Sequence, residues 1–100
     1  MDLELNKIYC MDCLEGIKLI PNKSVDLIFI DPPYGLNKTG ILNDENLRYY
    51  YSILPDMFRV LKDDSFFITF ASIGNLPLFF KDNPFTYRWQ YIQYINNGMA

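Results

Sequence analysis

The residues best suited to chemistry in this chain are the run Asp31-Pro32-Pro33-Tyr34. The prolines fix φ near about −65° and bias the residues before them toward extended backbone, so the run is stiff before any ligand arrives. Pro32 has a carbonyl but no N–H, so it forms a pair of hydrogen-bond acceptors with the Asp31 carboxylate. This pair suits a planar amino group with two N–H donors, and the Tyr34 ring offers a face for stacking.

The position of this run in the chain also favours a ligand site. Residues 24–31 are too few for a helix and almost continuously apolar, which is typical of a parallel strand covered on both faces. In an open α/β sheet, ligands bind at the carboxyl ends of the strands. The structural alternative is that Asp31 and the prolines form a rigid turn at the strand exit, with Tyr34 as a packing lid.

Asp12 and the two cysteines form a second group of candidate residues. Asp12 stands three residues before Glu15, the spacing of a capping box, and so predicts a helix start. Cys10 and Cys13 are the only cysteines and the chain has no histidine, so we expect no metal site. Their C-x-x-C spacing leaves a redox pair at a strand-to-helix junction as one hypothesis, and two reduced thiols in a cytoplasmic protein as the other.

The elements that must position these residues alternate between strand and helix patterns. A short apolar run at 8–11 precedes Asp12, and Pro21 ends the helix that starts there. Further along we expect a loop over 37–46, a helix over 47–61, a strand over 66–71, a short helix over 76–80 and a strand over 85–95. This alternation predicts βαβ units, that is, an α/β fold with a mostly parallel sheet and flanking helices, in a single domain over 1–100.

Two of these elements carry patterns that the structure can test in detail. The helix over 47–61 has a 3.6-residue apolar stripe, which Pro55 must kink or divide into two helices, and Lys62-Asp63-Asp64 closes it. The stripe consists of Leu47, Tyr50, Tyr51, Leu54, Met57, Phe58 and Leu61. In the last strand, aromatic residues alternate along one face, at positions Phe85, Tyr87, Trp89 and Tyr91.

Composition narrows the class of protein. Half of the 100 residues are hydrophobic, 17% are aromatic and 21% are charged, which excludes disorder as the default. The net charge of −3 argues against a domain that binds nucleic acid by electrostatics alone. No apolar run approaches the about 18 residues that a membrane span needs, and the start is acidic rather than signal-like. We therefore expect a soluble cytoplasmic protein without a membrane partner.

Several segments resemble the DNA methyltransferases that act on base amino groups, a family with a D-P-P-Y motif and S-adenosylmethionine as cofactor. The resemblance rests on residues 12–15, 21–28 and 31–34, followed more weakly by 58–62 and 66–70. Their order is similar to that of members in which the catalytic block precedes the cofactor block. The resemblance implies a Rossmann-like methyltransferase core, of which this chain would hold the half with the catalytic motif.

The resemblance also implies roles for individual residues. Asp31 and the Pro32 carbonyl would accept hydrogen bonds from the target amino group, Pro33 would complete the motif, and Tyr34 would stack on a base flipped out of double-stranded DNA. Aspartate in the first motif position favours adenine N6 over cytosine N4. Asp12 matches a family position near the adenosine of the cofactor, at the end of the preceding strand, although a helix cap would use the same geometry.

The chain departs from the family at the cofactor loop. None of its five glycines forms a G-x-G pattern, and the family arrangement places that loop after the catalytic block. We therefore expect a partial methyltransferase whose C-terminal half is missing, with self-association through aromatic residues on the exposed flank of the sheet. The alternatives are a non-catalytic remnant that serves as a subunit or interaction module, and a small thiol-redox protein.

Overall fold

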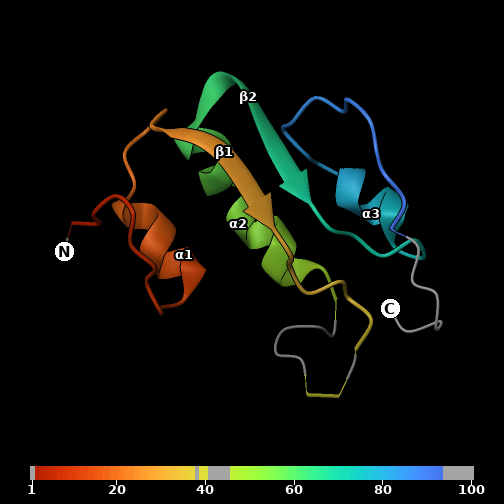
Figure 1. Ribbon diagram of the computed structural model, residues 1–100. Helices are drawn as coiled ribbons and strands as arrows, with labels where there is room; N and C mark the ends of the chain where they lie inside the picture. The colour runs from red at the N-terminus through yellow and green to blue at the C-terminus, as the bar shows by residue number, and fades with distance from the viewer. Residues whose placement is uncertain (1, 38, 41–45, 94–100) are drawn as a thin grey trace.

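The fold consists of two parallel strands with one long helix packed against one face of them and shorter helices at either side (Figure 1). The computed structural model describes residues 2–37, 39–40 and 46–93. In chain order the elements are α1 (Cys13–Gly16), the 3₁₀ turn η1 (Ile17–Leu19), β1 (Val25–Ile30), α2 (Arg48–Val60), β2 (Leu61–Thr69) and α3 (Leu76–Phe80). The predicted α/β class is confirmed at this level, and a larger Rossmann-like sheet stays a prediction.

The strands β1 and β2 form the predicted βαβ unit, with α2 as the connection between them. Leu27 pairs with Phe66 and Ile30 pairs with Thr69, so both strands run toward the same end of the molecule. The register shifts between Val25 and Leu27, and β2 begins at Leu61, earlier than predicted. Within this irregular stretch Asp64 has a left-handed φ of 59°. Helix α2 thus ends just before Lys62-Asp63-Asp64, as predicted, and these three residues lie inside a bulged strand.

Helix α2 supplies most of the core because its apolar side chains recur at helical spacing on one side. Pro55 lies inside α2 and does not divide it, since Leu54 and Met57 on either side are both buried in the core. Of the predicted stripe, Phe58 is 45% exposed, whereas the buried Ile53 was not predicted. Packing on one continuous face thus offsets the backbone hydrogen bond that Pro55 cannot make.

The core divides into two clusters along α2. One cluster contains Ile17, Ile53, Met57 and Val60, and packs against the inner face of the strands. The other contains Leu47, Tyr50, Leu54 and Phe79, and packs against Tyr34 and the segment around α3. The second cluster therefore connects the core to the Asp31-Pro32-Pro33-Tyr34 loop.

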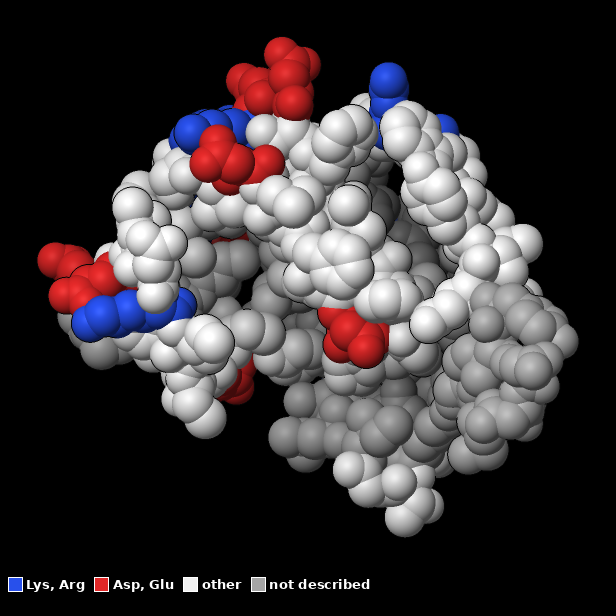
Figure 2. Space-filling view, viewed as in Figure 1, with Lys and Arg blue, Asp and Glu red and all other residues white. Residues whose placement is uncertain are grey.

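The outer face of the strands is about half exposed, so the prediction of strands buried on both faces is wrong. The exposed fraction is 53% for Leu27, 60% for Phe29 and 50% for Phe66. Figure 2 shows this surface over the strands as largely free of charged side chains. An apolar run indicates that a strand can be buried, but it does not show which other elements cover the strand. Among the described residues, no helix packs on this face.

Two further strands that the sequence predicts do not form. Residues 8–11 join no sheet, and Ile8 is fully exposed. Residues 85–93 also lie outside any sheet, while 94 and 95 lie outside the described residues. Here the Phe85 ring stacks on Phe67 with centroids 4.3 Å apart, and Trp89 contacts Phe66 at 6.1 Å. Aromatic contacts, in place of ladder hydrogen bonds, thus hold this segment against the sheet.

The remaining predictions are confirmed or fall outside the described part of the chain. Helix α3 has the predicted bounds, and α1 begins after Asp12 as predicted. Most of the predicted loop over 37–46, namely 38 and 41–45, lies outside the described residues. Among the residues that are described, no helix is long and apolar enough to cross a membrane.

Candidate active site

The Asp31-Pro32-Pro33-Tyr34 loop leaves the carboxyl end of β1, as the sequence predicts. The strand end is fixed by β2, since the Phe70 amide donates a hydrogen bond to the Ile30 carbonyl at 3.1 Å. The ends of both strands and the first turns of α1 and α2 all lie toward the same end of the molecule (Figure 1). The fold therefore gathers the candidate residues at the edge where parallel sheets bind ligands.

Within the loop, the Tyr34 hydroxyl donates a short hydrogen bond to Asp31 Oδ1. Burial, together with this bond and the negative charge of Asp31, raises the pKa of Tyr34 to about 12. Asp31 is exposed, and neither its Oδ2 nor the Pro32 carbonyl accepts a hydrogen bond from the part of the chain described here. Two acceptors thus remain for a ligand, while Tyr34 orients the carboxylate that carries one of them.

The loop is fixed from behind by Asn75, which immediately precedes α3. Its Nδ2 donates hydrogen bonds to the carbonyls of Tyr34 at 3.0 Å and Gly35 at 3.2 Å. Gly35 has a φ of 76°, and a Cβ there would lie 3.1 Å from the Asn46 carbonyl carbon. The turn after Tyr34 therefore requires glycine. Asn75 lies 41 residues from Tyr34 and no local motif marks it, so its contact with Tyr34 does not follow from the sequence.

Asp12 is confirmed as a helix cap, because its Oδ1 accepts a hydrogen bond from the Leu14 amide at 2.9 Å. The same oxygen accepts a bond from the Tyr49 hydroxyl at 3.1 Å. Cys13 Sγ lies 2.9 Å from that hydroxyl, and the thiol is the donor because Tyr49 gives its single proton to Asp12. Burial, followed by the neighbouring Cys13 and Asp12, raises the pKa of Tyr49 above its usual range. Sequence analysis did not single out Tyr49.

The other candidate chemistries find less support in the geometry. Cys10 and Cys13 are both free and exposed thiols. Over the described residues, no group of three His, Cys, Asp or Glu side chains could hold a metal ion.

The Asp12 carboxylate is exposed, and its Oδ2 accepts no hydrogen bond from a described residue, so it fits a hydroxyl or amino group of a ligand.

Comparison with known proteins finds relatives by sequence. The chain is 53% identical over 71 residues to the Type II methyltransferase M1.MboII of Moraxella bovis, and 39% identical over 66 residues to M.BamHI of Bacillus amyloliquefaciens. It is 35% identical over 72 residues to the DNA adenine methyltransferase YhdJ of Escherichia coli (strain K12). Over the aligned segments, the chain is related in sequence to DNA methyltransferases. No family model and no solved structure matches it.

The chain matches only part of these relatives. The aligned segments cover 66%, 59% and 66% of the chain for M1.MboII, M.BamHI and YhdJ, respectively. They cover 27%, 16% and 24% of those relatives, so the chain spans about a quarter of their length or less. The sequence similarity therefore concerns only one part of each relative.

Proposed function

We propose that this methyltransferase segment holds the amino group that receives the methyl group, which S-adenosylmethionine supplies as an activated sulfonium methyl. The proposed acceptor is the N6 of an adenine in double-stranded DNA. The observation that carries the proposal is the pair of ligand-accessible acceptors, Asp31 Oδ2 and the Pro32 carbonyl, on a loop stiffened by two prolines. That one matched relative is named a DNA adenine methyltransferase supports the choice of adenine.

The acceptor pair addresses the main difficulty of the reaction. The lone pair of an aromatic amine is delocalised into the ring, so the amine is a weak nucleophile. Hydrogen bonds from its two N–H groups to Asp31 and Pro32 localise the lone pair and direct it toward the methyl group. Asp31 need not be a strong base, because the methylated ammonium product is very acidic and loses its proton readily.

Tyr34 has two parts in this mechanism. An amino group inside a duplex is out of reach, so the base must leave the stack. Stacking on the Tyr34 ring offsets part of that cost, by about 1–3 kcal/mol. The hydroxyl of the same residue bonds to Asp31 and so ties the position of the ring to that of the carboxylate.

Asp12 is the residue of this chain that we assign to the cofactor. Its Oδ2 can accept a hydrogen bond from a hydroxyl group of an adenosine, because the Tyr49 hydroxyl and the Leu14 amide both donate to its Oδ1. The chain offers no glycine-rich loop beside it. We therefore expect S-adenosylmethionine to bind this chain by itself weakly or not at all, and a micromolar dissociation constant by calorimetry would contradict this expectation.

A chimaera tests the proposal. The matched stretch of M1.MboII is replaced by that of this chain, and transfer of a labelled methyl group to adenine in DNA is measured. We expect an active enzyme in which Asp31→Ala lowers the single-turnover rate by orders of magnitude and changes cofactor affinity by no more than a few fold. The parent M1.MboII serves as the control for folding and cofactor binding.

A second candidate function is a non-catalytic interaction module, which the uncovered apolar face of the strands favours. A chimaera that folds and binds cofactor like its parent but transfers no methyl group would support the module over the enzyme segment. A normal single-turnover rate in Asp31→Ala would remove Asp31 from the mechanism.

A further inference from the structure

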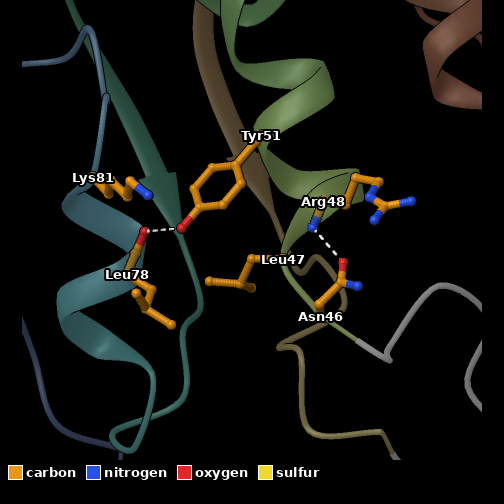
Figure 3. A pocket seen from close by; sticks show the side chains of 6 residues that line it. All are labelled: Asn46, Leu47, Arg48, Tyr51, Leu78 and Lys81. Carbon is orange, nitrogen blue, oxygen red and sulfur yellow. Dashed lines mark hydrogen bonds between the residues drawn. The ribbon is translucent and has the colours of Figure 1, made fainter.

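A cavity of about 420 Å³ lies between the first turns of α2 and the end of α3. It is separate from the Asp31-Pro32-Pro33-Tyr34 loop, which is called the acceptor loop below. Its lining residues are Asn46, Leu47, Arg48, Tyr51, Leu78 and Lys81 (Figure 3). Neighbouring residues hold both the cavity and the acceptor loop in place. Leu47 belongs to the cluster that packs against Tyr34, and Asn75, next to α3, bonds to the Tyr34 carbonyl.

The cavity carries positive charge that the chain does not neutralise. In the described ranges, five lysines and arginines form ion pairs, whereas Arg48, Lys81 and Arg88 form none. Two of these three unpaired cations line the cavity, and no described aspartate or glutamate lines it. In a chain of net charge −3, this is a local basic site.

The polar groups around the cavity are hydrogen-bond donors, whereas its floor is apolar. The Arg48 amide donates to Asn46 Oδ1 at 2.7 Å, which leaves the Asn46 NH₂ group for a ligand. The Tyr51 hydroxyl donates to the Leu78 carbonyl at 2.7 Å. Figure 3 shows the Lys81 ammonium pointing toward that hydroxyl, and the Arg48 guanidinium extending outward on the opposite side. Leu47 lies between them, and Leu78 lies on the side of Lys81.

We propose that this cavity binds a backbone phosphate of the DNA strand next to the base held at Asp31 and Tyr34, an inference that rests on the proposed function. A phosphodiester is an anion with acceptors only, which matches the donors on the two sides of the cavity, Lys81 on one side and Arg48 with the Asn46 amide on the other. Such contacts fix the register of DNA without reading its sequence. They would also supply the local positive charge that an acidic chain needs to approach DNA.

The test follows backbone amide resonances of the ¹⁵N-labelled full chain during titration with a short DNA duplex. We expect saturable shifts at Arg48, Tyr51 and Lys81. The double variant Arg48→Gln/Lys81→Gln should lose these shifts, and its affinity should fall at least several fold. The slope of log affinity against log salt should also become shallower, by about 0.9 for each phosphate that the variant no longer neutralises. Lys18→Gln, which removes an exposed charge on η1, is the matched control.

Further titrations separate this site from its alternatives. Inorganic phosphate that binds as tightly as the duplex would show a free-anion site and overturn the proposal. So would the absence of shifts at millimolar duplex, or a double variant that behaves like Lys18→Gln. A duplex of only G·C pairs should shift the cavity amides equally, whereas Tyr34 should respond only to adenine. Cavity shifts without a Tyr34 response would refute the proposed function and leave the phosphate site standing.

Discussion

At the scale of single residues, Tyr34 combines a ring that can stack with a hydroxyl that holds Asp31. The sequence predicts the ring function but not the bond between the two side chains. Tyr34→Phe keeps the ring and removes the bond, whereas Tyr34→Ala removes both. The two substitutions therefore separate stacking from the orientation of the carboxylate.

We expect Tyr34→Phe in the chimaera to flip the target base normally and to transfer the methyl group several-fold more slowly. Tyr34→Ala should also lose about 1–3 kcal/mol of flipped-base stabilisation. The measurements are the fluorescence of 2-aminopurine at the target position and the single-turnover rate, at matched folded fractions. Equal fluorescence enhancement in all three proteins would refute the stacking role.

Tyr50 makes stability sensitive to alkaline pH. It is 1% exposed, and burial raises the pKa of its hydroxyl to about 12 although the bond from Asn83 lowers it. The folded state therefore holds this proton more tightly than the unfolded state, whose tyrosine pKa is about 10. The contribution of this proton to the free energy of unfolding is complete below about pH 10 and is lost as the pH rises toward 12.

We expect the free energy of unfolding in urea to fall between about pH 10 and pH 12, and to fall less steeply in Tyr50→Phe, which has no hydroxyl to ionise. Tyr87→Phe, at a position 56% exposed, is the control. The explanation fails if Tyr50→Phe has the same pH slope as the original chain.

At the scale of elements, Arg59 joins the last turn of α2 to the turn before β1. Its guanidinium donates to the carbonyls of Ile17 at 2.9 Å and Ile20 at 2.8 Å, and to Asn22 Oδ1 at 2.8 Å. An ion pair with Asp56 at 3.0 Å orients it. These bonds satisfy carbonyls at the end of η1 and fix the direction in which the chain enters β1.

We expect Arg59→Lys to lower the free energy of unfolding by about 2 kcal/mol, because an ammonium cannot reproduce the planar set of donors. Urea denaturation measures the loss, with Arg88→Lys, at an exposed position, as the matched control. A difference of less than about 0.5 kcal/mol between the two variants would contradict the role given to Arg59.

The elements found from sequence are those whose signal is local. The stripe of α2, the cap at Asp12 and the short helix α3 each follow from spacing over one or two turns. The segments over 8–11 and 85–93 form no strand, because neither a short apolar run nor aromatic alternation distinguishes a hydrogen-bonded ladder from other packing. The place of Asp31 was predictable from the end of β1. The bonds of Tyr49 and Asn75 were not, since they join residues 37 and 41 positions apart.

At the scale of the whole molecule, the sheet of the described residues is open on two sides. Its outer face exposes apolar side chains, and a two-stranded sheet by itself is marginally stable. Beside β1 lies a second cavity of about 370 Å³, which runs from Leu3 and Tyr9 to Leu27 and Phe29. Figure 2 shows a hollow on this side of the strands. Both features mark surfaces that favour contact with further protein.

We expect the chain to self-associate through this outer face, with a sedimentation coefficient that rises with concentration. Phe29→Lys places a charge at the centre of the face and should weaken the association at least several fold. Leu5→Lys, at an exposed position in the N-terminal segment, should leave it unchanged. A monomer at all concentrations, with no apolar surface accessible to a dye, would contradict this expectation.

The position of Trp89 gives the outer face an optical probe of its own. It is the only tryptophan of the chain, its indole contacts Phe66, and the residue is 56% exposed. Indole emission moves to shorter wavelength when water leaves its surroundings. Any protein segment that covers the strands beside Phe66 will therefore shift the emission spectrum of the unlabelled chain. The size of the shift will report directly on how far the outer face is covered.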